Sequence, residues 1–253
     1  MSTVTDHYEK LLASVYAWMS GSAEAALEAG RSELDELALQ LPAGALVVDL
    51  GAGFGMHAVP LAREGMRVVA VDTSTSLLRE LDRLAQGLPI ETVADDLLSF
   101  RSHVKEKAAA VLCMGDTLTH LPEHHLVDFL VQEVHEALAP GGCFVLSFRD
   151  FTEPLKDEAR FIPVRSDERR ILTCFLEYEE DTVVVHDILH ERAGDAWETR
   201  VSSYRKLRLA PDRVIASLET IGFETRREQG ARGMVRVIGR IPQSAEMRGE
   251  SAH

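Results

Sequence analysis

Three glycines stand at alternate positions after an acidic residue, in the stretch VVDLGAGFGMHAVPLA (residues 47–62). Asp49 ends an apolar run, and Gly51, Gly53 and Gly55 follow with the spacing G-x-G-x-G. Glycine permits positive φ and lets the backbone approach a ligand closely. A strand that runs through such a turn into a helix is typical of cofactor sites in α/β proteins, although glycines also occur in these turns for structural reasons alone.

The residues around the glycines separate two candidate ligands. The dinucleotide fingerprint G-x-G-x-x-G requires a last glycine, and this sequence has Met56 there. S-adenosylmethionine has no pyrophosphate and carries an ammonium and a sulfonium group. An acid at the end of the first strand suits that positive charge, so Asp49 favours S-adenosylmethionine.

Acids also end the next two predicted strands. Asp72 lies 21 positions after Gly51, where a carboxylate can accept hydrogen bonds from both ribose hydroxyls. The alternative is that Asp72, Thr73 or Ser74 caps the following helix; the spacing favours ribose binding.

Asp95 and Asp96 follow the run IETVA, where the adenine amino group would be recognised, and simple solvation of the loop is the alternative for Asp96. We also assign Thr73, Leu97 and Met114 to the cofactor site. These residues place the ligand at the carboxyl edge of the predicted sheet.

The elements that must position these residues alternate regularly up to about residue 150. Two helices, 6–19 and 22–39, precede strand 45–50. After it we expect helices 55–64, 74–85 and 123–138, a short helical piece at 96–103, and strands 67–71, 90–94, 108–113 and 143–148. This alternation predicts an α/β fold, a Rossmann-like, doubly wound and mostly parallel sheet.

Beyond residue 150 three strand-like runs, 171–180, 182–192 and 197–209, have no helix between them and predict an inserted antiparallel sheet. A helix from Pro211 and two strands, 224–229 and 234–241, complete the core. We therefore expect one domain over 1–243, with a helical cap (1–40), a cofactor-binding core (41–150), the insertion (151–209) and a C-terminal part (210–243). The polar tail 244–253 is predicted to be disordered.

The composition and net charge of the chain indicate which kinds of partner it is expected to bind. The chain has 253 residues, 27% of them charged, and a formal net charge of −14, which disfavours a nucleic acid because phosphate binding relies on clustered Lys and Arg. No apolar run approaches the length of a membrane span, the N-terminus lacks signal-peptide features, and three scattered cysteines suggest buried thiols, so we expect a cytoplasmic protein. His186 and His190 lie in a strand-like run without a third ligand, so no metal is predicted.

Several motifs together resemble class I S-adenosylmethionine-dependent methyltransferases: VVDLGAGFG, VVAVDTS, ADD and LAPGGCFVLSF, within residues 40–150. The runs VLCMGDTLTHLPE and SFRDF are more narrowly similar to glycine N-methyltransferase and related small-molecule enzymes. The resemblance implies that Arg149 contacts a substrate carboxylate and that the N-terminal helices cover the site. Residues 114–117, Met-Gly-Asp-Thr, lack the proline pair and aromatic residue of enzymes that methylate exocyclic base amines.

Methyl transfer demands positioning above all, and a base only where the nucleophile must lose a proton. Asp116 and His120 are the candidate catalytic groups, with a turn cap and helix packing as equally weighted alternatives. The candidate substrate contacts are Tyr16, Trp18, Arg149 and Tyr204.

The sequence thus predicts an enzyme that moves a methyl group from S-adenosylmethionine to N or O of a small molecule. An NAD(P)-dependent oxidoreductase and a non-catalytic S-adenosylmethionine-binding module are the alternatives, and the oligomeric state stays open.

Overall fold

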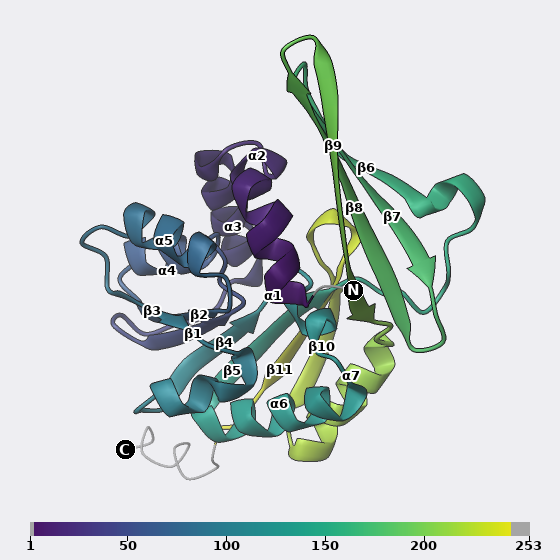
Figure 1. Cartoon of the computed structure of the whole chain (residues 1–253). Helices are drawn as coiled ribbons and strands as arrows, with labels where there is room; N and C mark the ends of the chain where they lie inside the picture. Colours follow the sequence, from purple (N-terminus) through teal and green to yellow (C-terminus); the bar gives the residue numbers. More distant parts are fainter. Residues whose placement is uncertain (1–2, 244–253) are drawn as a thin grey trace, which may run out of the picture.

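The computed structural model describes residues 3–243, which form two β-sheets connected by a helical N-terminal segment (Figure 1). The predicted disorder of residues 244–253 lies outside the described residues. None of the helices in the described part of the chain combines the length and the apolar composition that crossing a bilayer needs.

The larger sheet has seven strands in the order β10-β11-β5-β4-β1-β2-β3. Five of them pair in parallel, and β11 and β10 close one edge as an antiparallel hairpin. The strands are β1 (Leu46–Leu50), β2 (Arg67–Asp72), β3 (Ile90–Ala94), β4 (Ala108–Cys113), β5 (Leu138–Phe148), β10 (Glu224–Gln229) and β11 (Val235–Arg240). This confirms the predicted mostly parallel α/β sheet.

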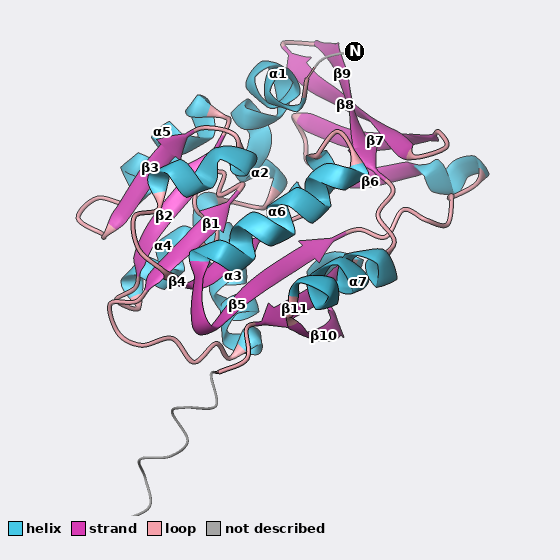
Figure 2. Ribbon diagram, turned by 90° about the horizontal axis from the view of Figure 1, so that it is seen from below, coloured by secondary structure: helices cyan, strands magenta, loops and turns pink. Residues whose placement is uncertain are grey.

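Helices cover both faces of this sheet, which is why β1 is buried along its whole length. On one face Val48 and Leu50 pack with α6 (His124–Ala137) and α7 (Pro211–Ile221), which Figure 2 shows lying across the strands. On the other face Val47 packs with α3 (Ala23–Leu37), α4 (Ala58–Arg63) and α5 (Thr75–Leu84).

The smaller sheet is antiparallel, in the order β6-β7-β8-β9, and lies between β5 and α7 in the chain. Its strands are β6 (Phe161–Ser166), β7 (Arg170–Tyr178), β8 (Thr182–Ala193) and β9 (Ala196–Leu207). The predicted antiparallel insertion is confirmed, but β6 was missed because it contains Pro163 and is mostly exposed, which hides the alternation of a half-buried strand.

Two predicted elements differ in detail. The segment predicted as one helix over 6–19 is broken into α1 (Val4–His7), a π-helical turn (Tyr8–Leu12), a 3-10 turn (Ala13–Val15) and α2 (Tyr16–Met19). Strand β5 begins at Leu138 rather than at residue 143, because Leu138 pairs with Ala108 across an irregularity in the β4 ladder.

Candidate active site

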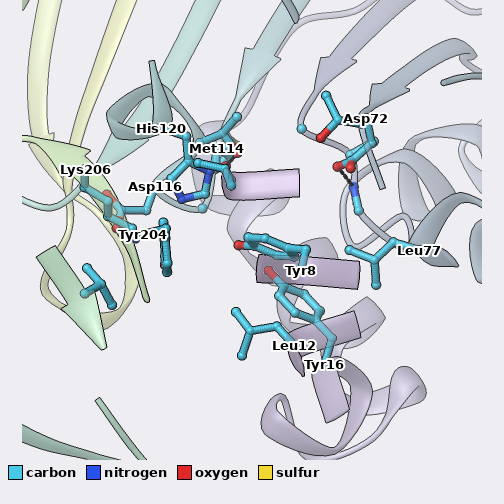
Figure 3. Close-up of a pocket in the computed structure, with 18 of the residues that line it drawn as sticks. Tyr8, Leu12, Tyr16, Asp72, Leu77, Met114, Asp116, His120, Tyr204 and Lys206 are labelled. Atoms are coloured by element: carbon cyan, nitrogen blue, oxygen red, sulfur yellow. Dashed lines mark hydrogen bonds and ion pairs between the residues drawn. The ribbon is translucent and has the colours of Figure 1, made fainter. Parts of the chain in front are cut away.

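A cavity of about 420 Å³ lies at the carboxyl edge of the parallel strands, between the N-terminal segment and the smaller sheet. In Figure 3, Asp72 and Leu77 lie on one side of it, and Asp116, His120, Tyr204 and Lys206 on the other. We call these sides the cofactor end and the acceptor end. The volume is in the range of small-molecule sites.

The glycine turn forms the floor of the cofactor end. Gly51 and Gly53 both have positive φ, 72° and 55°, and both line the cavity. A Cβ atom at Gly51 would lie 2.4 Å from the Thr117 side chain, whereas one at Gly53 would meet only Leu77, at 3.8 Å. Gly51 is therefore needed for packing, and Gly53 leaves free backbone toward a ligand.

Asp72 lines the cofactor end and organises the turn opposite it. Its carboxylate accepts hydrogen bonds of 2.8 Å from the N–H groups of Gly53 and Ser74. Of the three residues that could cap α5, Ser74 is the N-cap, and its hydroxyl accepts a hydrogen bond from the Leu77 N–H. Asp72 therefore does not cap this helix. Burial raises the pKa of Asp72. Each oxygen keeps a lone pair for a further donor.

Asp49 is buried behind the turn and does not line the cavity. Its Oδ2 atom is buried without a hydrogen-bond partner among residues 3–243. Burial raises the pKa of Asp49 to about 6, opposed by nearby His57 and the Ala58 N–H. Asp49, predicted to suit the positive charge of the cofactor, thus lies behind the turn rather than among the residues that line the cavity.

The remaining predicted cofactor residues all line the cavity: Thr73, Asp95, Asp96, Leu97 and Met114. Asp95 contacts His103 Nε2 at 2.7 Å and accepts from the Asp96 N–H, while Asp96 caps the 3-10 helix Leu97–His103 by accepting from Leu98 N–H. The carboxylates of Asp95 and Asp96 thus already have local partners.

At the acceptor end, Asp116 forms a buried ion pair that sequence inspection did not find. Lys206 Nζ lies 2.5 Å from Asp116 Oδ2, and both side chains are nearly inaccessible. Asp116 Oδ1 accepts from the Arg149 backbone N–H at 2.9 Å. Burial raises the pKa of Asp116, but Lys206 and the Arg149 N–H outweigh it, so that the pKa is lowered.

His120 lies beside this pair and lines the cavity. Its Nε2 atom is buried and has no hydrogen-bond partner in the described part of the chain. Burial lowers the pKa of His120 to about 3, and the charge of Lys206 adds to the effect. The imidazole is therefore neutral at physiological pH.

Two arginines line the cavity. Arg149 Nη1 donates to the Arg232 carbonyl at 3.2 Å, and its Nε lies 4.0 Å from Asp116 Oδ2. Arg232 has φ 53° and lies 3.8 Å from Glu33. Arg149 and Lys206 thus lie beside Asp116, whereas the Arg232 guanidinium lies near Glu33 and Met56.

Aromatic side chains enclose the acceptor end. Tyr16 and Tyr204 line the cavity as predicted, together with Tyr8, and burial raises the pKa of all three phenols. Trp18 does not line it: its indole N–H donates to Asp167 and its ring lies near Arg165 and Arg170. The predicted substrate contact of Trp18 is therefore withdrawn, since the side chain faces the smaller sheet instead.

The residues missed from the sequence are Lys206 and Arg232. A signal existed for Lys206, because successive side chains of a strand alternate and Lys206 shares a face with the predicted Tyr204. Arg205, on the opposite face, pairs with Glu179.

The cofactor end fits S-adenosylmethionine on three observations. Asp72 offers lone pairs for ribose hydroxyls, Gly53 leaves bare backbone, and the unpartnered carboxylate oxygen of Asp49 favours a nearby cation. A dinucleotide would need a glycine where Met56 stands.

Comparison with known proteins agrees with this fit. Residues 47–142 match a family described as "Methyltransferase domain". The chain is 28% identical over 107 residues to a glycine/sarcosine N-methyltransferase from Aphanothece halophytica, a match that covers 42% of this chain and only 40% of that relative.

Solved structures share nearly the whole fold. An S-adenosylmethionine-dependent methyltransferase from Clostridium acetobutylicum has a TM-score of 0.74 at 14% identity, covering 93% of this chain and 99% of that one. The glycopeptide N-methyltransferase MtfA with bound S-adenosyl-L-homocysteine has a TM-score of 0.58 at 25% identity, covering 84% and 87%. The match of residues 47–142, the relatives and the shared fold together support a class I S-adenosylmethionine-dependent methyltransferase, with S-adenosylmethionine as its cofactor.

Proposed function

We propose that the protein transfers a methyl group from S-adenosylmethionine to a nitrogen or oxygen atom of a small-molecule acceptor. The observation that carries this proposal is the continuity of one cavity from Asp72 to His120, enclosed by the N-terminal segment and the smaller sheet. A module that only sensed the cofactor would have no use for a second, polar end. An enclosed end of this size suits a small acceptor better than a polymer.

When bound, the cofactor supplies a methyl carbon already activated by the sulfonium. The chain then has to hold the acceptor in line with that carbon and keep water away. Tyr8, Tyr16 and Tyr204 supply uncharged walls for this task. His120 stays a candidate catalytic group, since its ring lines the acceptor end, although its Nε2 atom is buried. Asp116, held by Lys206 and by the Arg149 N–H, supports the site without acting as a base.

The proposed cofactor contacts are those of the carboxyl edge: Gly51, Gly53, Asp72, Thr73, Asp95, Asp96, Leu97 and Met114. All four predicted segments of the chain contribute side chains to the cavity, as Tyr8, Asp72, Lys206 and Arg232 illustrate, and we propose that they act as one domain.

Turnover tests the proposal directly. The purified protein is incubated with S-adenosylmethionine and a panel of small amines, amino acids, amino sugars and phenols, and S-adenosylhomocysteine is quantified. Formation that depends on one acceptor supports the enzyme. Tight cofactor binding without turnover on any acceptor supports the binding module, and binding of NADH in preference to S-adenosylmethionine supports the oxidoreductase.

Arg149 is the proposed contact for an anionic group of the acceptor. A guanidinium can hold a carboxylate by two hydrogen bonds in a geometry that lysine does not reproduce. We expect Arg149→Lys to raise the KM for a carboxylate-bearing acceptor severalfold and to leave the Kd for S-adenosylmethionine unchanged. Wild-type kinetics of the variant, or an acceptor without any anionic group, would refute this role.

A further inference from the structure

The smaller sheet has one edge strand that nothing protects from pairing. Its two edges are β6 and β9, and β9 pairs only with β8 among the described strands. An edge strand offers unpaired N–H and C=O groups to other chains, and proteins commonly block such an edge with proline or irregular pairing. Strand β6 has Pro163 and a shift in its register with β7, whereas β9 has no proline along its 12 residues.

The free part of this edge is the outer end of the β8-β9 hairpin. Residues 192–201 are all exposed, and Figure 1 shows the hairpin extending beyond the rest of the molecule. Trp197 and Val201 lie on the same face of β9 and are 46% and 59% exposed. The N-terminal segment packs on the opposite face, where His7 meets Ser202. The face with Trp197 therefore stays open.

The backbone groups of the odd-numbered residues of β9 face the open edge. Arg208, directly after β9, donates its N–H to the Asp181 carbonyl, directly before β8. Successive residues of a strand point their N–H and C=O groups to alternate sides, so the even-numbered residues of β9 bond to β8. The groups that face outward at the exposed end are those of Trp197, Thr199 and Val201.

Opposite charges favour one register for a second copy at this edge. In a two-fold antiparallel pair, outward-facing residues stand opposite one another, so the axis passes through a single position of β9. With the axis at Thr199, Glu198 stands opposite Arg200 of the second copy, and Trp197 opposite its Val201. An axis at position 198 or 200 would instead place two glutamates or two arginines face to face.

Glu198 also lacks a complementary charge across the hairpin. Its cross-strand partner is Glu191, and like charges directly opposite each other destabilise a ladder. Arg200 pairs with Glu191, at 2.5 Å, and leaves Glu198 to the open side. An arginine from a second copy would balance this charge.

We propose that the β8-β9 hairpin is the contact surface of a homodimer, in which two β9 strands pair antiparallel about a two-fold axis at Thr199. The two four-stranded sheets then form one continuous sheet. This pairing satisfies the outward backbone groups, brings Trp197 together with Val201, and forms the ion pair of Glu198 and Arg200 twice by symmetry.

The mass of the full chain in solution tests the proposal. At about 100 µM, above the micromolar Kd of weak interfaces, we expect sedimentation to give twice the chain mass of 28.0 kDa. Thr199→Pro removes an N–H that the single chain does not use, and edge strands tolerate proline, so this variant should be a folded monomer. A monomeric wild type overturns the proposal, and so does a dimeric Thr199→Pro.

Charge reversal tests the register. Glu198→Arg and Arg200→Glu each place like charges across the axis, so each variant alone should dimerise about tenfold more weakly or less. An equimolar mixture restores both opposite pairs and should dimerise like the wild type, as should the variant that carries both changes. Dimerisation of the single variants at wild-type strength, or a mixture that stays monomeric, overturns the register.

Cross-linking tests the same register if a charge variant does not fold. Opposed residues of a hydrogen-bonded pair have Cα atoms about 5.5 Å apart, which fits a disulfide. Mild oxidation should therefore link Thr199→Cys into dimers. Val201→Cys should stay unlinked, because it stands opposite Trp197, as should the wild type with its three free cysteines. Linkage through position 201 but not 199 contradicts an axis at Thr199.

Discussion

Asp72 serves two partners with one carboxylate, because it holds the N–H groups of Gly53 and Ser74 and still faces the cavity. We expect Asp72→Ala to raise the Kd for S-adenosylmethionine tenfold or more. The reason is the loss of charge-assisted hydrogen bonds to ribose, worth roughly 1.5–3 kcal/mol. Isothermal titration calorimetry on wild type and variant measures the effect.

Ser74→Ala is the matched control for that experiment. It removes the hydroxyl that caps α5, and one of the two hydroxyls that donate to Glu9, and should lower the free energy of unfolding by about 1 kcal/mol. Its Kd for the cofactor should change far less than that of Asp72→Ala. Equal Kd values for the two variants would mean that the Asp72 carboxylate acts only on the turn.

Asp49 makes the stability of the cofactor-free protein depend on pH. Its pKa is raised from 3.8 to about 6 by burial, so the folded protein retains a proton that the unfolded chain releases between these values. This contribution lowers stability as the pH rises from about 4 to 6, and it reaches roughly 3 kcal/mol at higher pH.

Asp49→Asn should remove this penalty. We expect the free energy of unfolding of the variant, relative to the wild type, to increase between pH 4.5 and 7.5, as measured by urea denaturation without cofactor. S-adenosylmethionine should stabilise the wild type more than the variant, because its positive charge offsets the buried carboxylate. A difference between the two proteins that is independent of pH contradicts the raised pKa.

The position of helix α3 depends on a close backbone contact that helix propensity does not predict. Gly30 lies inside this helix, where alanine would normally be more stable by about 1 kcal/mol. A Cβ atom there would lie 1.9 Å from the Met56 carbonyl oxygen, just after the glycine turn. The helix therefore approaches the cofactor-binding segment as closely as two backbones can.

We expect Gly30→Ala to lower the free energy of unfolding by about 1–3 kcal/mol through overpacking, and to weaken cofactor binding because Met56 lines the cavity. Ala29→Gly, on the exposed side of α3, should lose about 1 kcal/mol by propensity alone with unchanged cofactor affinity. Thermal unfolding and calorimetry compare the two. A stabilised Gly30→Ala would show that α3 has room to shift.

At the scale of elements, the parallel sheet and its carboxyl edge follow from sequence because apolar runs and helical segments alternate locally. The breaks in the N-terminal helix have no such local signal, since they depend on Leu11 and Leu12 packing against the smaller sheet. The pair of Asp116 and Lys206 joins residues 90 positions apart, so no spacing rule predicts it. Site residues that directly follow a predicted strand, such as Asp72, could be identified from the sequence. Site residues that reach the cavity only through long-range folding, such as Lys206, were missed.

Across the whole molecule, charge is distributed unevenly. The chain has a net charge of −14, and Asp72, Asp95 and Asp96 line the cofactor end of the cavity, whereas Arg149 and Lys206 lie beside Asp116 at the acceptor end. A cationic cofactor and an acceptor with an anionic group therefore each meet complementary charge.

The N-terminal segment connects the two sheets across this cavity (Figure 1). His7 bonds to Asp187 and Ser202 of the smaller sheet, at 2.9 and 2.8 Å. Glu9 accepts hydrogen bonds from the hydroxyls of Ser74 and Ser76 at the start of α5. The segment is thus held on both sides of the cavity. The contact at His7 is fully buried, whereas Glu9 is exposed.

We expect Glu9→Ala to release the cofactor side of the segment without unfolding the protein. Amide hydrogen exchange of residues 4–12 should accelerate, and S-adenosylmethionine should dissociate severalfold faster, since Tyr8 and Thr73 both line its cavity. Lys10→Ala is the matched control, because Lys10 is exposed and its ammonium pairs with Asp6, at 3.5 Å. If both variants exchange and release the cofactor at the same rate, the contacts of Glu9 with α5 do not retain the ligand.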